Sequence, residues 1–486
     1  MLPNVKVNIT EEVNLVNSKL NTFLPLVILK TKTGPIGTET LVKSAKAFTD
    51  TFGTPDSSTP EAFGIVQYIK NFGSAYIVRV AGTGAAEATG KITTDSTDLI
   101  SVKSKYKTDS LNGVEVNLVI SSTDNKLYIE STVEGKLITS IKETINYSTA
   151  KADEFEKALN KIITSFNEAQ NYFVLENLFV SKTEEDDKPT AFDKATATLG
   201  SGVSGNSSVQ DTDVTKLLEN YRKTDIGIDA IVTPGFESIE VVTKLANVAH
   251  DSSFIGIASI SGSSASIIAA TAATYPKSES LALYADKVYL YEDPTIEVPA
   301  CIAVLPAYIT KDLSSKWLAP AGVKRGTLSI VAGLVHTFSD SDLEELYINT
   351  VPVNGIKKIS GRGYIVWGQK TTAEDNYQYQ DRINVTRLVK YLEKEIYSIS
   401  YDYLFEPITE YTYNSWTLRV ESILEEIKTG NGLSEYKVVM DDTLNTEETK
   451  KANKLIGVVR FKPLEAAEFI EINFVVTDSV EEGGNE

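Results

Sequence analysis

The chain has 486 residues, of which 42% are hydrophobic and 23% are charged, a composition typical of a globular protein with about two to four domains. Its formal net charge of −19 disfavours a nucleic-acid partner, because phosphate binding needs clustered Lys and Arg side chains. The only cysteine, Cys301, excludes an intrachain disulfide. The only histidines, His250 and His336, leave too few ligands for a zinc site built from His and Cys.

The sequence shows neither a targeting segment nor a membrane span. The first residues contain no basic stretch followed by an apolar run, so we expect no secretory signal. Residues 252–276 lack charge over a length that would span a bilayer, but Ser, Ala, Thr and Gly dominate them. A Gly-Ser break at 261–264 favours a buried strand (254–260) followed by a helix (266–273). We therefore expect a soluble protein made in a cytosol.

The N-terminal part of the chain predicts a terminal arm followed by the start of an α/β domain. Val5, Val7 and Ile9 alternate as strand residues do, but no tight turn links them to a following strand. A strand is then expected at 24–30. Two helices follow, at 40–52 and from Thr59-Pro60 to about residue 71, and a strand at 74–81 completes the series. Strand, helix, helix and strand in this order are typical of an α/β domain.

The middle of the chain predicts a β-rich insertion and then a return to the α/β domain. Residues 90–177 are rich in Thr, Ser, Asp and Lys, with strands expected at 114–121 and 126–131 and a helix at 152–166. Residues 181–208 form a polar linker whose acidic cluster lacks the ligand spacing of a calcium loop. The α/β pattern resumes with helices at 215–221 and 240–249 and strands at 228–235, 286–293 and 298–309.

The C-terminal part predicts two amphipathic helices and a last strand. Apolar residues at helical spacing mark the helices: Val385, Leu388, Val389, Leu392, Ile396; Trp416, Val420, Ile423, Leu424, Ile427. Gly430 is a suitable residue to end the second helix. In the last strand apolar residues alternate with Glu471 and Asn473: Ile470, Ile472, Phe474, Val476. This strand can pair within its own subunit or with a neighbouring one.

No pattern in the chain indicates catalysis. Residues 82–90 (GTGAAEATG) start like a dinucleotide-binding loop, but the third glycine is out of place and no helix is expected after it. His250, Asp251 and Ser252 are adjacent in sequence and lack a nucleophile elbow. The sequence contains no GxxxxGK[ST], HExxH, CxxC or GxSxG motif. We expect no enzyme activity, no cofactor and no catalytic, cofactor-binding or metal site.

Several segments together resemble the contractile phage tail sheath proteins. The N-terminal match consists of GPIG (34–37), LVKSAKAFTDTFG (41–53), AFGIVQYIKNFG (62–73) and AYIVRV (75–80), in that order. The C-terminal match consists of KWLAPAGVKRGTL (316–328), GRGYIVWGQKT (361–371) and DRINVTRLVKYLEKEI (381–396). The resemblance covers most of the chain outside the insertion and the two arms.

This resemblance implies an α/β fold with α+β elements: a central α/β core, an inserted β-rich domain, a C-terminal α/β domain and extended terminal arms. The expected limits are an N-terminal arm at 1–20, core at 21–90 and 209–350, insertion and linker at 91–208, C-terminal sheath domain at 351–465 and C-terminal arm at 466–486. In the family, the arms of neighbouring subunits complete a sheet in a third subunit's C-terminal domain. The resemblance thus implies these linking residues: Val5, Val7, Ile9, Ile470, Ile472, Phe474, Val476.

The function implied by the resemblance is that of a structural subunit of a contractile tail sheath. Such a subunit forms a helical homopolymer of hexameric rings around a tail tube. The polymer contracts to drive the tube through a cell envelope. Its further partners are the baseplate and tail terminator proteins. It would belong to the tail of a virion or injection particle assembled in a bacterial cytoplasm, without nucleic-acid contact or membrane insertion. A headless R-type bacteriocin or related injection system is the alternative. In the family the C-terminal block faces the tail tube, so Arg382, Arg387, Arg419 and Lys428 could contact the tube. A solvated face is the default interpretation of these cations, and none of them is singled out.

Overall fold

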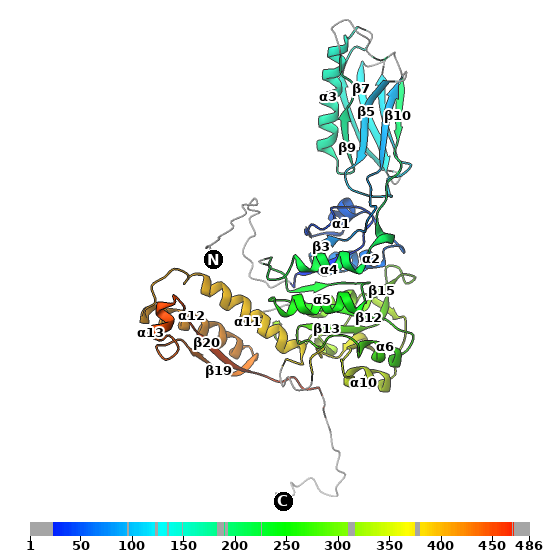
Figure 1. The fold of residues 1–486 in the computed structure, drawn as a ribbon. Helices are drawn as coiled ribbons and strands as arrows, with labels where there is room; N and C mark the ends of the chain where they lie inside the picture. Colours follow the sequence, from blue (N-terminus) through cyan, green and yellow to red (C-terminus); the bar gives the residue numbers. More distant parts are fainter. Residues whose placement is uncertain are drawn as a thin grey trace, which may run out of the picture. The chain divides into compact units, whose positions relative to one another are not determined.

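The computed structural model describes residues 23–94, 97–121, 125–133, 136–147, 149–181, 189, 193–224, 226–309, 316–374, 380–468 and 470. The chain divides into two compact units, residues 1–316 with 320–394 and residues 317–319 with 395–486. Helices and several sheets alternate along it, which confirms the expected mixed α/β class (Figure 1). The domain limits expected from the sequence stay a prediction.

The core of the first unit is a six-stranded sheet in the order β13-β12-β11-β1-β3-β2. Five of its strands are parallel, and β2 pairs antiparallel with β3 at one edge. Its strands are β1 (Pro25–Leu29), β2 (Thr40–Val42), β3 (Ala75–Arg79), β11 (Ala230–Val232), β12 (Ile255–Ile260) and β13 (Leu281–Ala285). All five residues of β1 are buried, as expected for a parallel strand covered on both faces.

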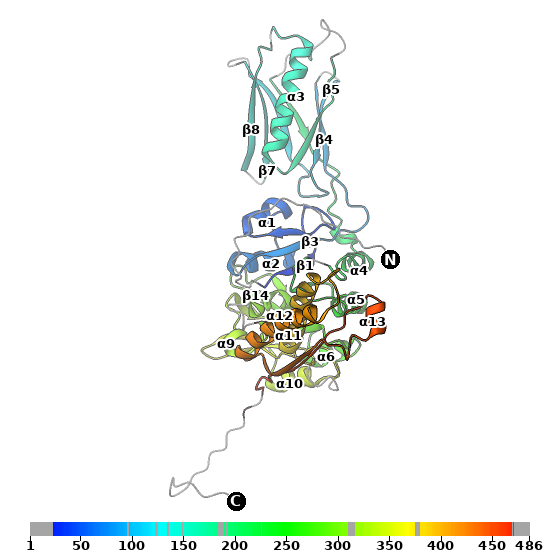
Figure 2. The same cartoon turned by 90° about the vertical axis from the view of Figure 1, so that its left-hand side faces the viewer.

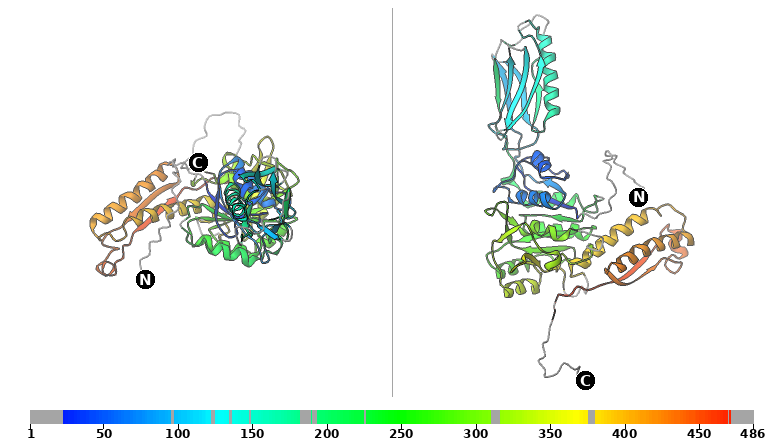
Figure 3. Two further views of the ribbon diagram at one scale, coloured as in Figure 1. Left: turned by 90° about the horizontal axis from the view of Figure 1, so that it is seen from above. Right: turned by 180° about the vertical axis from the view of Figure 1, so that it is seen from behind.

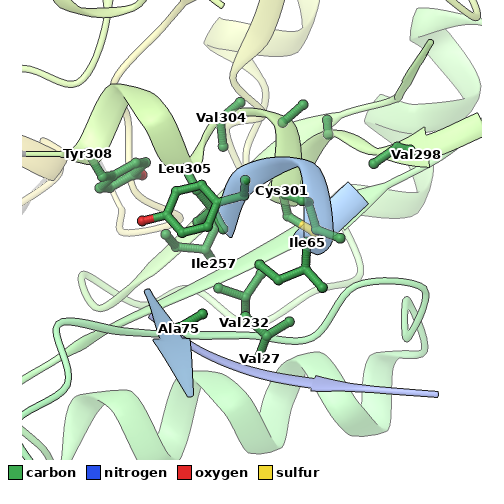
Figure 4. Close-up of a cluster of buried hydrophobic side chains, with 14 of the residues drawn as sticks. Val27, Ile65, Ala75, Val232, Ile257, Val298, Cys301, Val304, Leu305 and Tyr308 are labelled. Carbon is green, nitrogen blue, oxygen red and sulfur yellow. The ribbon is translucent and has the colours of Figure 1, made fainter. Parts of the chain in front are cut away.

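Helices cover both faces of this sheet, and alternate residues of β1 enter the two cores. Val27 and Leu29 belong to the first core, which also contains Ile65 and Cys301 (Figure 4). Leu26 and Ile28 belong to the second core. The first core includes α1 (Ala45–Phe52), α2 (Pro60–Asn71), α7 (Ala300–Ala303) and α8 (Leu305–Tyr308), and the second includes α4 (Asp211–Glu219), α5 (Ile239–His250) and α6 (Ala265–Ala272).

Two expected elements of the core are corrected by the structure. Residues 298–309 were expected to form a strand, but β15 (Glu297–Pro299) leads directly into α7 and α8. The six residues 300–305 are all 0% exposed. A segment that is apolar on every side shows neither the helical nor the strand period of polar residues, so its sequence does not distinguish a helix from a strand. The helix expected from residue 40 begins at Ala45 instead, because Thr40–Val42 pairs with β3 and the Ser44 hydroxyl caps the helix at the Ala47 N–H (3.1 Å).

The insertion contains two antiparallel sheets and one helix. The sheet orders are β10-β6-β7-β8 and β4-β5-β9. The elements are β4 (Thr89–Thr94), β5 (Thr97–Ser104), β6 (Glu115–Ser121), β7 (Lys126–Val133), β8 (Lys136–Thr144), α3 (Ala152–Ala169), β9 (Phe173–Asn177) and β10 (Lys194–Thr198). Helix α3 lies along the strands (Figure 2) and buries one stripe that includes Phe155, Leu159 and Phe166. The region is β-rich, as expected, but part of the expected linker 181–208 forms β10, which pairs with β6.

The remaining elements range from the three-residue η1 to the helices α11 and α12, which have 19 and 20 residues. They are η1 (Asn206–Ser208), β14 (Lys287–Leu290), α9 (Gly322–Arg325), β16 (Val331–Leu334), α10 (Asp340–Ile348), β17 (Gly355–Ile359), β18 (Gly363–Trp367), α11 (Ile383–Tyr401), α12 (Glu410–Thr429), β19 (Leu433–Val439), α13 (Glu447–Lys451) and β20 (Val458–Pro463). The uncharged stretch 252–276 forms β12 and α6, as expected. Among the described residues, no helix combines the length and apolarity needed to cross a bilayer.

Candidate strand-addition site

The second unit contains a sheet of only two strands. Strands β19 and β20 pair antiparallel, with Tyr436 opposite Phe461 and Val439 opposite Val458. No third strand among the described residues pairs with the outer edge of either one. An outer edge exposes a row of backbone N–H and C=O groups that can accept a further strand. The strand pair β19–β20, which is connected through α13 and is called the hairpin below, therefore offers two edges for strand addition.

Helix α12 supports this hairpin from one side (Figure 3). Its buried stripe includes Trp416, Val420 and Leu424, residues that were expected to face a core. The helix begins at the Thr409 cap, whose hydroxyl accepts the Thr412 N–H at 3.3 Å, and it ends before Gly430 as the sequence predicts. The rigid helix fixes the hairpin from the side and leaves its edges open.

A tryptophan from an earlier part of the chain holds the turn between α12 and β19. The Trp317 indole N–H donates to the Gly430 carbonyl oxygen at 3.0 Å. A Cβ on Gly432 would lie 2.8 Å from Cδ1 of the same ring, closer than real Cβ contacts. Glycine is thus required where the turn passes the indole. This explains physically why the segment around Trp317 belongs to the same unit as the hairpin.

The structure places one of the seven residues expected to link subunits. Ile470 is 80% exposed and lies outside any strand. The other six lie outside the described residues: Val5, Val7, Ile9, Ile472, Phe474, Val476. The structure therefore does not bring the seven together, and their linking role stays a prediction.

All four cations expected to face a tail tube contact groups of their own chain. The Arg419 guanidinium donates to Asp402 at 2.7 Å, and the Lys428 ammonium lies 5.7 Å from the centre of the Tyr436 ring. Arg382 pairs with Asp381. Arg387 donates to the Tyr308 carbonyl oxygen at 2.9 Å, and burial lowers the pKa of its guanidinium. Arg387 is thus partly buried against the Tyr308 carbonyl group.

The second unit also exposes large apolar side chains that the sequence analysis did not single out. They are Tyr397 (59% exposed), Tyr401 (52%), Leu404 (57%), Phe405 (87%), Tyr411 (82%) and Leu418 (67%). Tyr397 and Tyr401 stack edge to face with ring centres 5.0 Å apart. Their spacing of four residues along α11 was the available signal in the sequence. Large exposed apolar side chains are typical of protein–protein contacts where they form a continuous patch, and Tyr397 and Tyr401 are in direct contact.

The side chains that resembled catalytic groups have other partners. His250 contacts Glu279, Asp251 pairs with Arg222, and the Ser252 hydroxyl accepts the Lys223 N–H at 2.9 Å, so these three residues form no relay. Cys301 is 0% exposed, and burial raises the pKa of its thiol to about 12. Across the described part of the chain, no group of three or more His, Cys, Asp or Glu side chains is placed to hold a metal ion.

Residues 375–477 match the family described as the phage tail sheath C-terminal domain. The chain is 31% identical over 191 residues to the tail sheath protein of Vibrio phage KVP40 and 32% identical over 169 residues to that of Enterobacteria phage T4. These matches cover 39% and 35% of this chain, and the chain spans 28% and 25% of the length of the two relatives.

Solved structures resemble the chain over nearly its whole length. The sheath complex of the extracellular contractile injection system PVC, in the contracted state, has a TM-score of 0.57 and 14% identity, covering 99% of both chains. The contracted helical sheath of the anti-feeding prophage has a TM-score of 0.55 and 16% identity, covering 98% of this chain and 99% of its own. The sheath tail protein of Desulfitobacterium hafniense has a TM-score of 0.59 and 11% identity, covering 95% of this chain and 100% of its own. At these identities the likeness shows a shared fold.

Proposed function

We propose that this chain, a relative of the contractile phage tail sheath proteins, is the structural subunit of a contractile sheath. It polymerises helically around a tail tube and contracts to drive the tube through a cell envelope. The observation that carries the proposal is the β19–β20 hairpin, a two-stranded sheet inside the segment that matches the sheath C-terminal domain. Neither of its outer edges has a partner strand among the described residues. Strands added at these edges would pair the outward-facing backbone N–H and C=O groups and extend the sheet that α12 supports.

Terminal arms are the strands that we propose for these edges. The C-terminal arm begins a few residues after β20, and the high exposure of Ile470 supports pairing outside its own subunit. Main-chain hydrogen bonds would provide the affinity, and the alternating apolar residues of the arms would set the register. Such a contact joins different surfaces of neighbouring subunits and does not close on itself, so it generates a helix of subunits.

Contraction then requires subunit bodies that repack while the arms stay linked. We propose that the extended polymer is kinetically trapped and that the repacked polymer has the lower free energy. The arms act as hinged tethers, and the core faces are the surfaces that exchange contacts. No catalytic step and no cofactor take part.

The partners in this proposal are other copies of the chain in hexameric rings, the tail tube, the baseplate and the tail terminator. Self-assembly and baseplate association are supported by solved relatives described as a sheath complex, a helical sheath and a baseplate. The tube and terminator contacts, the absence of nucleic acid and assembly in the host cytoplasm rest on the family resemblance. The domain limits 1–20, 21–90, 91–208, 209–350, 351–465 and 466–486 are part of the same proposal.

A second candidate is the sheath of a headless bacteriocin or related injection particle. Its only support is the fold that the chain shares with the PVC and anti-feeding prophage sheaths at 14% and 16% identity. The sequence matches to phage KVP40 and phage T4 favour the phage tail. Electron micrographs of native particles decide between them, because a phage carries a DNA-filled head on its tail and an injection particle does not.

Deletion of the arms tests the tether directly. Three variants are compared with the full chain by negative-stain electron microscopy over a concentration series: one without residues 1–13, one ending at residue 466, and a control ending at 478. We expect striated tubes or stacked rings from the full chain and the control, and native circular dichroism but no polymer from the other two. Where the full chain alone stays monomeric, tube protein is added as a template.

Polymers that survive either arm deletion would contradict the tether. A full chain that forms no polymer even with the tube protein would contradict the sheath function itself.

A further inference from the structure

Arg79, the last residue of β3, is completely buried and hydrogen-bonded only to backbone carbonyl groups. One guanidinium nitrogen, Nη1, donates to the carbonyl oxygens of Gly34 (2.9 Å) and Lys107 (2.8 Å). The other, Nη2, donates to the carbonyl oxygen of Ser204 at 2.8 Å. The side chain is 0% exposed, which is rare for arginine.

These three carbonyl groups belong to three different parts of the chain. Gly34 lies in the turn after β1 of the core. Lys107 lies in the segment between β5 and β6 of the insertion, and Ser204 lies in the segment that returns from β10 to the core. One planar side chain thus joins the core to the β5–β6 connection of the insertion and to the segment that returns from the insertion.

Further contacts surround this junction. The Thr108 hydroxyl donates to the Lys32 carbonyl oxygen at 2.8 Å, and the Asn206 amide donates to the Thr31 carbonyl oxygen at 3.1 Å. A Cβ on Gly202 would lie 2.0 Å from the Thr108 carbonyl oxygen. The segments therefore touch without space between them, and small changes of angle would cause clashes.

The charge of Arg79 is costly to bury. Desolvation lowers the pKa of its guanidinium to about 10, and Asp109 acts in the opposite direction. Asp109 accepts a hydrogen bond from the Ser204 hydroxyl at 2.9 Å, and the carbonyl group of the same serine accepts one from Arg79. At pH 7 the guanidinium stays charged. Its rigid planar fork can hold several carbonyl groups in fixed directions, which the flexible, single-point ammonium of lysine cannot do equally well.

We propose that Arg79 is a positioning residue that locks the insertion to the core, so that both move as one rigid body. Without it, the two connecting segments, near residues 81–88 and 199–206, would act as a double hinge. This inference does not rest on the sheath function. It holds for the isolated subunit and predicts that any rearrangement of a polymer carries the insertion along with the core.

Pulsed electron paramagnetic resonance on the monomeric full chain tests the lock. Spin labels are attached through Lys46→Cys in α1 and Lys157→Cys in α3, whose side chains are 79% and 77% exposed. The natural Cys301 is 0% exposed and stays unlabelled. In the doubly labelled chain with Arg79 intact, we expect one narrow distribution of label-to-label distances. After Arg79→Met we expect the width of this distribution to increase roughly twofold or more, because the hinge is then released.

A matched control and a conservative variant complete the experiment. Arg222→Met removes an arginine of the core domain that pairs with Glu219 and Asp251. This change should leave the distance distribution unchanged. Arg79→Lys keeps the charge but loses the planar fork, and should give an intermediate width. A broad distribution before any change at residue 79, or an unchanged width in Arg79→Met, overturns the proposal. Where circular dichroism shows that Arg79→Met does not fold, the width in Arg79→Lys decides in the same way.

Discussion

At the scale of single residues, the side chains that connect distant segments matter most for the first unit. Asn354 is an example. Its side-chain amide donates to the carbonyl oxygens of Leu283 (3.1 Å) and Lys370 (2.7 Å) and accepts the Lys370 N–H at 2.8 Å. It is 0% exposed, so no water can replace these bonds. The amide thus connects β13, an edge strand of the central sheet, to the segment after β18.

Replacing this amide should destabilise the first unit. For Asn354→Ala we expect a loss of about 2–4 kcal/mol in the free energy of unfolding, because buried backbone groups lose their partners. Urea unfolding followed by circular dichroism measures it. Asn414→Ala on the exposed face of α12 is the control and should change the value by less than about 0.5 kcal/mol. A loss below about 1 kcal/mol for Asn354→Ala would contradict this role.

At the scale of elements, close approach of α2 to its neighbours decides the packing of the first core. Gly64 lies in the middle of α2, and a Cβ there would be 2.5 Å from Cγ1 of Val298 and 3.3 Å from Cγ2 of Ile302. Alanine usually stabilises a helix by about 1 kcal/mol relative to glycine. Here the steric cost of overpacking, about 1–3 kcal/mol, should outweigh that gain.

We therefore predict that Gly64→Ala lowers the midpoint of thermal unfolding. Gly73→Ala is the matched control, because nothing lies within 4 Å of a Cβ at that position. That change should be neutral or stabilising by up to about 1 kcal/mol, since alanine restricts the unfolded chain. Differential scanning calorimetry compares the two variants. Equal stabilisation by both would show that α2 has more room than its contacts indicate.

At the scale of the whole molecule, net charge should control assembly. The chain carries a formal charge of −19, so approaching subunits repel each other. The screening length falls from about 30 Å at 0.01 M salt to about 8 Å at 0.15 M. We predict that added NaCl lowers the protein concentration at which polymers first form.

Light scattering over a protein concentration series at several salt concentrations measures this threshold, with electron microscopy to confirm ordered polymers. Sucrose at matched viscosity is the control and should not reproduce the salt effect. A threshold that rises with salt would show that ion pairs between subunits outweigh the repulsion, and the proposed role of the acidic surface would then be wrong.

The sequence alone determined the features that depend on short-range patterns. An uncharged run interrupted by a Gly-Ser break predicted β12 and α6, and helical spacing predicted α12. Capping residues predicted where α2 starts and where α12 ends, because these signals lie within one or two turns of the chain. The two arms were expected from alternating apolar residues near both ends of the chain, whereas the strands β19 and β20 were not predicted from the sequence. The arms themselves lie outside the described residues except Ile470, so their role stays a prediction.

Only the tertiary structure decided the features that depend on distant neighbours. The run from Ala300 to Tyr308 folds as two short helices because it is buried on every side, which removes the polar face that a period requires. Leu41 and Val42 fit a helical spacing, yet they belong to β2 because β3 lies beside them. Arg79 resembles an ordinary strand end in sequence. Its role becomes visible only when residues 34, 107 and 204 converge on its guanidinium, since no local pattern encodes contacts across such separations.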